Sequence, residues 1–548
     1  MNNGYIQRRN LLLSSILRHA ARHHGRAEVI THPGGSGTAV RLGYQAIEAR
    51  CRRLAGSLRA LGIGAGDRVS SLAWNDHRHF ELYYGVTGIG AILNTINVRL
   101  SLADIGYVLE NARSSALFVD HSLLPIVTEL APRFPRELRD IVVIAGPAED
   151  LPLPAGIRVH AYEDLVDERH ELSEWPDFDE DAACFLAYTS GTSGRPKGVL
   201  HSHRSVTLAC YTVNTADMYG LRAVDRVLPA AQMYHAMGWL LPYCAPMVGA
   251  TLVLTGRTLD GAGLYEILQA ERVSMAFAVP TVWMGLLDHV ESRRLGLDFL
   301  KRAHFGGAPV TEALMRRFET LGIRVTQSWG MTEAGPVGVF NAPTPESEKL
   351  TGDARLSVEL KQGRPPFNMS IRIVDEAGAE LAWDGKSMGR FNVSGPMVIS
   401  RYFGSSDRSA FDGDWLDTGD VATIDPNGFV KLVDRTKDVI KSGGEWISSI
   451  EIENAVAAHA GVAEAAVVGI AHPKWGERPL LVIVFRPGAR VDQQEILRFL
   501  EGKIANWWRP DSMVVVEALP RTSIGKIDKR ELRAAYANLY EPSGGATD

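Results

Sequence analysis

The sequence predicts an α/β protein with a large N-terminal domain of doubly wound sheets, a β-rich subdomain and a small α+β C-terminal domain. Three observations lead to this fold class. Apolar strand-like segments alternate with segments of helical period over the first 330 residues. Short strands separated by Gly, Pro and Asp turns follow from about residue 360. A chain of 548 residues is too long for one hydrophobic core, so two or more domains are expected.

The first 330 residues predict a mostly parallel sheet covered by helices on both faces, because strands joined by helices bury both sides of a sheet. An amphipathic first helix is expected within residues 11–24. The expected strands are residues 68–73, 91–96, 116–119, 251–254 and 275–279, and the expected helices are residues 44–61, 77–88, 102–110, 263–271 and 311–321.

The last third predicts two further units. Strands at residues 369–375, 389–394, 421–424 and 429–433 form the β-rich subdomain, at about 360–434. Strands at 439–440, 463–470 and 480–485 and helices at 449–458 and 493–504 form the C-terminal unit, which is large enough to fold alone. We therefore expect an N-terminal domain of residues 1–434 and a C-terminal domain of residues 435–548.

Composition excludes several classes of protein. The hydrophobic fraction is 45%, the charged fraction is 22% and the net charge is −6, and no basic tract supports nucleic-acid binding. The four cysteines form no Cys-x-x-Cys pair, which indicates buried thiols in a reducing compartment. No apolar run reaches the length of a membrane span, and Arg8-Arg9 is not followed by a signal-peptide pattern. We expect a cytoplasmic protein with no integral membrane association.

The segment Tyr188-Thr-Ser-Gly-Thr-Ser-Gly-Arg-Pro-Lys-Gly-Val199 is the strongest functional signal. Small residues let backbone amides approach an anion, hydroxyls add donors, and Lys197 adds a mobile positive charge. By composition alone it could equally be a surface turn or a linker. The order of residues excludes a P-loop, because Lys197 lies between Pro196 and Gly198, and it also excludes a Gly-x-Gly-x-x-Gly fingerprint.

Three later segments carry groups suited to nucleotide chemistry. Thr332 and Glu333, at the end of an expected strand, offer hard oxygen ligands for Mg²⁺, although Thr-Glu pairs are common in ordinary turns. Asp420 could accept hydrogen bonds from a ribose diol, or could be a turn residue. Lys526, in the segment that begins Leu519-Pro-Arg-Thr-Ser, is by itself a typical solvated charge.

Taken in order, the four segments resemble the motifs of the adenylate-forming (AMP-binding) enzymes, which include acyl-CoA synthetases, luciferases and peptide-synthetase adenylation domains. The resemblance implies ATP, Mg²⁺ and coenzyme A as cofactors. It gives Lys526 the catalytic role, Asp420 and Arg435 the ribose, and Thr332 and Glu333 the metal. It gives the rest of the nucleotide to Thr189, Ser190, Gly191, Thr192, Ser193, Gly194, Lys197, Gly307, Ala308, Pro309, Ser328, Trp329, Gly330 and Met331.

The segment from Asp434 to Ser448 resembles that of medium- and long-chain fatty acyl-CoA synthetases and of methylmercaptopropionate–CoA ligases. The resemblance implies a mobile C-terminal domain that rotates between two steps, with its hinge at Lys437. It also implies that Lys441 faces the site in the second conformation, although Lys441 could instead be a solvated strand charge. The same comparison gives Gly443, Gly444, Glu445 and Trp446 the passage of the coenzyme A arm.

The acid pocket is predicted from the segment that begins at Met233. By the resemblance, His235 lines the carboxylate site, and Trp239, four residues on, is expected to share its helical face and to line or block an acyl tunnel. Gly306, Gly335 and Pro336 complete the expected pocket. Neighbouring Leu240, Leu241, Met247 and Val337 favour an apolar acid.

The resulting prediction is an ATP-dependent acid–CoA ligase for an apolar acid, fatty or thioether-containing. It forms acyl-AMP with release of pyrophosphate and then transfers the acyl group to coenzyme A. Two alternatives are an adenylating enzyme that loads a carrier protein or releases acyl-AMP, and a luciferase-like oxygenase. A third is a non-catalytic nucleotide-binding protein. The expected partners are small molecules, without nucleic acid, and the oligomeric state is left open, a homodimer included.

Overall fold

A computed structural model describes residues 5–33, 37–148, 151–189, 195–443, 445–489, 491–521 and 527–540. The chain forms two compact units. Unit 1 comprises Met1–Ser370 and Ser394–Leu416, and unit 2 comprises Ile371–Val393 and Asp417–Asp548. This division runs through the expected β-rich subdomain, so that segments before residue 434 belong to unit 2. The boundary at residue 434 stays a prediction.

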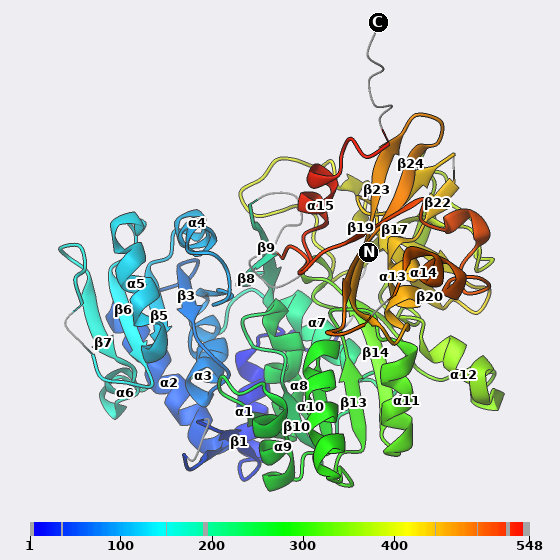
Figure 1. Cartoon of the computed structure of the whole chain (residues 1–548). Helices are drawn as coiled ribbons and strands as arrows, with labels where there is room; N and C mark the ends of the chain where they lie inside the picture. Colours follow the sequence, from blue (N-terminus) through cyan, green and yellow to red (C-terminus); the bar gives the residue numbers. More distant parts are fainter. Residues whose placement is uncertain are drawn as a thin grey trace, which may run out of the picture. The chain divides into compact units, whose positions relative to one another are not determined.

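A seven-stranded sheet forms the first layer of unit 1 and is drawn mainly in blue to cyan in Figure 1. All neighbouring strands are parallel except the last pair, which is an antiparallel hairpin. In spatial order the strands are β7 (Arg158–Ala161), β6 (Asp140–Ile144), β5 (Ala116–Asp120), β3 (Arg68–Leu72), β4 (Ile92–Thr95), β8 (Ala183–Thr189) and β9 (Lys197–Ser202).

Helices bury the apolar side chains of this sheet. Ile105, Leu109 and Val127 of α4 and α5 pack with sheet residues such as Leu117 and Val143 in one hydrophobic cluster. The helical segments of this part are α2 (Tyr44–Ala60), α3 (His77–Gly85), η1 (Thr87–Ile89), α4 (Leu102–Ala112), η2 (His121–Leu123), α5 (Leu124–Leu130), η3 (Ala131–Arg133), α6 (Tyr162–Leu165) and η4 (Glu168–His170).

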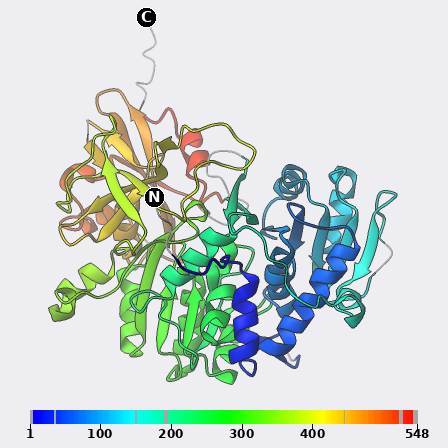
Figure 2. The ribbon, with the colours of Figure 1, turned by 180° about the vertical axis from the view of Figure 1, so that it is seen from behind.

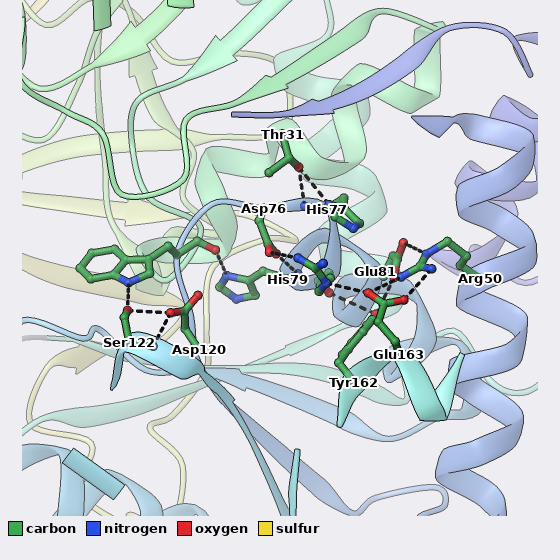
Figure 3. Close-up of polar contacts among 12 residues, drawn as sticks. Thr31, Arg50, Asp76, His77, His79, Glu81, Asp120, Ser122, Tyr162 and Glu163 are labelled. Carbon is green, nitrogen blue, oxygen red and sulfur yellow. Dashed lines mark hydrogen bonds and ion pairs between the residues drawn. The ribbon is translucent and has the colours of Figure 1, made fainter. Parts of the chain in front are cut away.

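A buried polar network ties α2, α3 and α6 together (Figure 3). Arg50 Nε donates to Glu81 Oε1 at 2.6 Å, and the Tyr162 hydroxyl donates to Glu81 Oε2 at 2.6 Å. Glu163 accepts from both Arg50 and Arg78. Burial raises the pKa of Glu81 to about 7, although the positive charge of Arg50 opposes this shift.

An eight-stranded sheet forms the second layer of unit 1. Its two outermost pairs, β14 with β15 and β1 with β2, are antiparallel, and the other pairs are parallel. In spatial order the strands are β15 (Gly338–Phe340), β14 (Arg324–Gly330), β13 (Arg302–Phe305), β12 (Met275–Ala278), β10 (Arg226–Pro229), β11 (Thr251–Leu254), β1 (Glu28–Thr31) and β2 (Val40–Gly43). The first two strands of the chain therefore join a sheet whose other strands lie about 190 residues later.

Helices α9 to α11 bury one face of this sheet, where Leu268, Trp283 and Phe318 pack against Ala276 and Phe305. The amphipathic α1, dark blue at the front of Figure 2, packs against α2 and α8. The helical segments are α1 (Ser14–His23), α7 (His203–Val213), η5 (Ala236–Leu240), α8 (Leu241–Val248), α9 (Gly261–Ala270), α10 (Pro280–Arg293), α11 (Glu312–Thr320), η6 (Thr332–Ala334), η7 (Ser347–Lys349) and α12 (Gly352–Glu359).

Unit 2 is built on two small sheets. The first has the order β16-β17-β19-β18, with β20 on β19, and its last strand β18 (Phe411–Asp412) belongs to unit 1. The second has the order β22-β21-β24-β23, with β25 on β24. The strands are β16 (Ser370–Val374), β17 (Gly389–Ser394), β19 (Trp415–Ile424), β20 (Val430–Arg435), β21 (Ile440–Ser442), β22 (Glu445–Ile447), β23 (Val462–His472), β24 (Gly476–Phe485) and β25 (Ser512–Val515).

The second sheet carries a hydrophobic cluster on each face. Val467 and Leu481 pack with Ile452 and Ile496, whereas the neighbouring Val468 and Leu480 pack with Leu532. Successive strand residues point to opposite faces, so this alternation is what a sheet covered on both sides requires. The helical segments are α13 (Ser449–Ala457), α14 (Gln493–Phe499), η8 (Asn506–Trp508) and α15 (Lys529–Ala535).

The predicted α/β class is confirmed, and each predicted element of the sequence analysis coincides with a helix or strand, with three main differences in length. β24 begins at Gly476 rather than at 480. β19 begins at Trp415 rather than at 421, because the Asp-Thr-Gly sequence that is typical of a turn here lies within a paired strand. α14 ends at Phe499 rather than at 504, and Gly502 follows with a left-handed φ of 75°. The four cysteines are buried and unpaired, as expected. Within the described ranges, none of the helices has the length and apolar content that crossing a membrane requires.

Candidate active site

The first predicted nucleotide segment is the connection of the β8–β9 hairpin. Thr189 ends β8 and pairs in register with Lys197, which begins β9. Ser190, Gly191, Thr192, Ser193 and Gly194 lie outside the described residues. The Lys197 ammonium lies 4.7 Å from the ring centroid of Tyr402, a cation–π distance that holds the charge in place at the end of the hairpin.

The second segment is a tight turn between β14 and β15. The two strands pair as far as Gly330 and Gly338, and Thr332 and Glu333 lie in the turn that joins them. A Cβ on Gly330 would lie 2.2 Å from the Pro336 carbonyl oxygen, so only glycine permits this close approach. Ser328, Trp329, Gly330 and Met331 lead into the turn, and Gly335 (φ 72°) and Pro336 lead out of it.

Tyr402 connects these two segments. Its hydroxyl donates to Glu333 Oε1 at 3.0 Å, and its ring carries the Lys197 ammonium. The Glu333 residue is buried, with 7% of its surface exposed. Lys197 and Glu333, which are 136 positions apart in the chain, are thus brought to one aromatic side chain of the 399–405 segment. A cavity of about 450 Å³ adjoins the same segment and is lined by Leu200 and residues 399–405.

Thr332 has a neighbour on β9, the His201 ring. Burial lowers the pKa of His201 to about 4, although the neighbouring Thr332 backbone carbonyl opposes this shift. A neutral imidazole on the strand that begins with Lys197 thus lies next to the turn that contains Glu333. Among the described residues, no group of three His, Cys, Asp or Glu side chains could hold a metal ion.

The segment after β10, a strand of the same sheet as β14, contains two of the predicted acid-pocket residues, His235 and Trp239. His235 is exposed, and Trp239 lies in η5. The residues from Met237 to Leu240 have left-handed φ values of 48°, 58°, 53° and 63°. The prediction that His235 and Trp239 share a helical face is therefore wrong, because this run is not a right-handed helix. Left-handed backbone costs about 1–2 kcal/mol for each non-glycine residue.

Trp239 lies directly on the turn after β13. A Cβ on Gly306 would lie 2.9 Å from Cη2 of the Trp239 indole, and one on Gly307 would lie 3.9 Å from Cζ2. Ala308 and Pro309, which follow, are exposed. The structure therefore brings Trp239 and Gly306 together, whereas Gly335 packs against Met397.

In unit 2, Asp420 and Arg435 form a directly paired couple. They are register partners on β19 and β20, and Arg435 Nε lies 3.0 Å from Asp420 Oδ1. Asp420 is buried and Arg435 is exposed. The two residues are fifteen positions apart in the sequence, and the hairpin of β19 and β20 places their charges side by side.

The remaining predicted residues of unit 2 follow this hairpin. Lys437 is exposed in the turn between β20 and β21. Partial desolvation by its surroundings lowers the pKa of its ammonium group. Lys441 forms an exposed ion pair with Glu376, and its ammonium lies 5.9 Å from the ring centroid of Trp446. Gly443 (φ 62°) donates its N–H to the Trp475 carbonyl at 2.7 Å, and Glu445 is exposed.

In unit 2, two predicted residues lie outside the described part of the chain, namely Gly444 and Lys526. Residues on either side of the second are described: Arg521 and Ile527 form an isolated antiparallel bridge. Nearby, Lys529 pairs with Glu453 at 2.8 Å and donates to the Ser449 hydroxyl at 2.6 Å.

Four residues that lie next to the predicted site residues were not predicted from the sequence: Tyr402, His201, Trp475 and His304. His304 lies on β13, with its ring centroid 6.3 Å from that of Trp239. A tyrosine within Arg401-Tyr-Phe-Gly404 has no local signal, because its role depends on a tertiary contact with Glu333. Trp475 is exposed next to Gly443, where a Cβ would lie 3.1 Å from its ring. The sequence signal for Trp475 is its place between His472-Pro473 and Gly476, which indicates an aromatic side chain in a turn.

Comparisons with known proteins identify the family of the chain. The family described as "AMP-binding enzyme" matches residues 17–403, and "AMP-binding enzyme C-terminal domain" matches residues 451–526. The chain is 41% identical to a 3-methylmercaptopropionyl-CoA ligase of Ruegeria lacuscaerulensis, with 97% of this chain and 98% of the relative covered. It is 40% identical to a medium-chain-fatty-acid–CoA ligase of Ectopseudomonas oleovorans, with 98% of each covered.

Solved structures show the same fold. ATP-bound MatB from Rhodopseudomonas palustris superposes with a TM-score of 0.81 at 25% identity, with 97% of this chain and 100% of that chain covered. An anthranilate CoA ligase in complex with anthranoyl-AMP superposes with a TM-score of 0.82 at 23% identity, with 96% and 97% covered, and shows the fold alone. The chain belongs to the AMP-binding enzyme family.

Proposed function

We propose that the protein is an ATP-dependent acid–CoA ligase that acts on an apolar carboxylic acid, fatty or thioether-containing. The acid is joined to AMP with release of pyrophosphate, and the acyl group is then transferred to the thiol of coenzyme A. The observation that carries this proposal is the contact of Lys197 and Glu333 with the same tyrosine, Tyr402. Relatives of about 40% identity are named as ligases of methylmercaptopropionate and of fatty acids, which supports the choice of acid.

Unit 1 supplies the groups that fit ATP and Mg²⁺. Glu333 is a buried carboxylate, and its Oε1 accepts a hydrogen bond from the Tyr402 hydroxyl. With the Thr332 hydroxyl it makes a set of hard oxygen ligands, which Mg²⁺ prefers together with phosphate oxygens. When bound, the ion neutralises phosphate charge. Lys197, at the end of the hairpin connection, is placed to clamp the phosphates and to help release pyrophosphate.

The polar residues around the turn would act as positioning groups. Tyr402 would orient the Glu333 carboxylate, and the neutral His201 ring on β9 would face the Thr332 backbone. Partners of this kind hold a ligand set in its productive geometry and are typically worth 10- to 100-fold in affinity or activity. Gly307, Ala308 and Pro309 would form the exposed turn against the adenine, and Ser328, Trp329, Gly330 and Met331 would line the same nucleotide.

Unit 2 supplies the groups proposed for the ribose and for the second step. The buried Asp420 carboxylate would accept hydrogen bonds from ribose hydroxyls, and its ion pair with Arg435 would orient it. Lys437 is proposed as the hinge, which suits an exposed residue in the turn between two strands. Gly443, Gly444, Glu445 and Trp446 are proposed for the coenzyme A arm, and Lys441 for the thioester step. Lys526 is proposed to stabilise the charge that develops on the α-phosphate.

The apolar character of the acid follows from the residues around Trp239. Trp239 contacts Gly306 directly and Gly307 more loosely, and the segment that follows it is Leu240 and Leu241, both buried. Indole and aliphatic side chains favour an acid without further charges, because a buried unpaired charge is strongly unfavourable. His235, which is exposed beside this wall, is proposed for the carboxylate end, with Gly335 and Pro336 beyond it.

The test is release of pyrophosphate and formation of a CoA thioester across saturated, thioether-containing and aryl acids. We expect both products with apolar acids, and loss of pyrophosphate release in Lys526→Ala but not in the matched surface variant Lys386→Ala. Acyl-AMP without CoA consumption across the whole panel would contradict the ligase assignment. If the acyl group is transferred to a carrier protein in preference to coenzyme A, the carrier protein is the acceptor. Unchanged pyrophosphate release in Lys526→Ala would contradict the catalytic assignment of that residue.

A further inference from the structure

We propose that His304 is a positioning residue that fixes the Trp239 indole against Gly306 and thereby sets the length of acid that the enzyme accepts. This inference rests on the proposed acid–CoA ligase function and on the placement of Trp239 at the acid. Its basis is a group of side chains next to the indole, namely the buried rings of His304, Tyr219 and Phe340 and the partly buried hydroxyls of Thr326 and Ser328.

His304 is held by both of its ring nitrogens. It lies on β13 with none of its surface exposed. Nδ1 lies 2.9 Å from the Thr326 hydroxyl, and Nε2 lies 3.0 Å from the Ser328 hydroxyl. These two residues are on the same face of β14, because they are two positions apart in a strand. Burial lowers the pKa of His304 to about 3, so the ring is neutral and pairs with one hydroxyl as donor and with the other as acceptor.

Aromatic rings surround the imidazole as well. Phe340 stacks on it with ring centroids 5.1 Å apart and an interplanar angle of 5°. Tyr219 lies 5.3 Å away at 67°, and Trp239 lies 6.3 Å away at 89°. A ring with two hydrogen bonds and a parallel stack cannot withdraw without losing all three interactions. His304 is therefore a fixed wall on one side of the indole.

Gly306 contacts the same indole. The position of a Cβ on Gly306 would be 2.9 Å from Cη2 and 3.2 Å from Cζ3 of Trp239, so the indole rests on the glycine backbone. His304 and Gly306 are only two residues apart, at the end of one strand and the start of its turn. The indole is thus confined by two positions of the same segment, on β13 and just after it.

The backbone that carries the indole is strained, and one hydroxyl holds it. Met237, Trp239 and Leu240 account for three of the eight described non-glycine residues with positive φ. The Tyr219 hydroxyl donates to the Trp239 carbonyl at 3.3 Å. Strained backbone persists where the surroundings over-determine it, and it concentrates at sites where a side chain must be held in one place. Tyr219 and His304 together supply that constraint.

Acid length follows from this confinement. An indole that cannot move away from the acid limits the space available to an alkyl chain. A smaller side chain at position 304 would leave room behind the indole, while the hydroxyls of Thr326 and Ser328 could still bond to an amide. The confined indole therefore sets an upper limit on the length of the acid, and space at position 304 raises that limit.

The experiment measures kcat/KM for CoA thioester formation with saturated acids of increasing length. The variants are His304→Asn and Tyr219→Phe, with the exposed His170→Asn as the matched control. We expect His304→Asn to raise kcat/KM about 10-fold for acids at least two carbons beyond the wild-type optimum, with the KM for ATP unchanged. Tyr219→Phe should shift the profile in the same direction by a smaller factor, and His170→Asn should leave it unchanged.

A gain with longer acids cannot come from a loss of structure, so this outcome distinguishes positioning from a merely structural role. The inference is overturned if folded His304→Asn keeps the wild-type length profile, or loses activity equally with all acids. If His304→Asn does not fold, Tyr219→Phe decides, because it removes one oxygen atom and keeps the ring; an unchanged profile there also overturns the inference. A wild-type enzyme that makes no CoA thioester with any acid contradicts the proposed function itself, before any variant is compared.

Discussion

The two sides of the candidate site in unit 1 are held by different kinds of interaction. On the nucleotide side, Lys197, Tyr402 and Glu333 form a chain of a cation, a ring and a carboxylate. On the acid side, Trp239 is held by contact with Gly306 and by a strained backbone, with the rings around His304 behind it. The first side is electrostatic and common to any acid that is activated. The second side depends on shape and can differ between enzymes that share the same chemistry.

This difference predicts how substitutions act. A change on the nucleotide side removes charge from the reacting phosphates and should lower activity with every acid. A change on the acid side alters space, and should redistribute activity among acids while leaving the use of ATP intact. The following predictions test this separation, beginning with the largest effect.

Glu333→Gln should lower kcat/KM for pyrophosphate release at least about 100-fold with all acids, because an amide keeps the shape but cannot neutralise a bound cation. Tyr402→Phe removes only the hydroxyl that orients the carboxylate and should cost about 10-fold. Pyrophosphate release measured at saturating acid checks both. Equal losses in the two variants would mean that Tyr402 does more than orient Glu333.

Gly306→Ala should lower kcat/KM for the preferred acid roughly 10-fold while leaving the KM for ATP unchanged. The added methyl would lie 2.9 Å from the indole, so Trp239 must shift toward the acid. Gly285→Ala is the matched control, because no atom lies within 4 Å of its added methyl. A rise in the KM for ATP as large as that for the acid would show that the two sides are not separable.

The same contrast explains what could be predicted from the sequence. Lys197, Glu333, Asp420 and Arg435 could all be predicted as site residues because phosphate, metal and ribose contacts need particular charged groups, which stand out in a motif. Their pairings were not found. The Asp420–Arg435 contact depends on the hairpin of β19 and β20, and Tyr402 approaches Glu333 from a segment that has no motif.

The acid side was predicted less well for a physical reason. The segment Met237-Gly-Trp-Leu240 contains one glycine, whereas four residues adopt left-handed φ values, so local preference gives no signal for this conformation. It is imposed by tertiary contacts such as the Tyr219 hydroxyl. The position of β1 and β2 in the second sheet is likewise tertiary, because alternation of strands and helices predicts a parallel sheet but not which strands are neighbours.

The Arg50–Glu81 network gives a third region for comparison, with buried charge but no proposed part in the reaction (Figure 3). The pKa of Glu81 is raised on folding from its ordinary value near 4.5 to about 7, so the folded state holds this proton more tightly than the unfolded chain does. The resulting stability is present below pH 4.5 and is lost as pH rises through about 7. We expect it to amount to at most about 3 kcal/mol.

Thermal unfolding of the wild type and of Glu81→Gln from pH 5 to pH 8 measures this contribution. The variant should show a flatter dependence, with kcat/KM unaffected at fixed pH below the unfolding temperature. Glu163→Gln is the contrasting variant. Burial raises the pKa of Glu163, but its bonds with Arg50 and Arg78 outweigh that effect and lower it, so its contribution is lost as pH falls. Identical pH profiles for wild type and Glu81→Gln would contradict the raised pKa.

The smallest expected effect belongs to unit 2, where Lys441 pairs with Glu376. Both side chains are more than half exposed, so the pair is screened by water and Glu376→Gln should leave the melting temperature unchanged. If Lys441 serves the thioester step, Glu376→Gln frees it from the ion pair and should raise the CoA-dependent rate by no more than about twofold. The effect is small because an exposed ion pair holds a lysine only weakly. Lys441→Ala should instead lower that rate while pyrophosphate release in the absence of coenzyme A stays the same. A solvated strand charge predicts no change in either variant, so rates of both half-reactions decide between the two roles of Lys441.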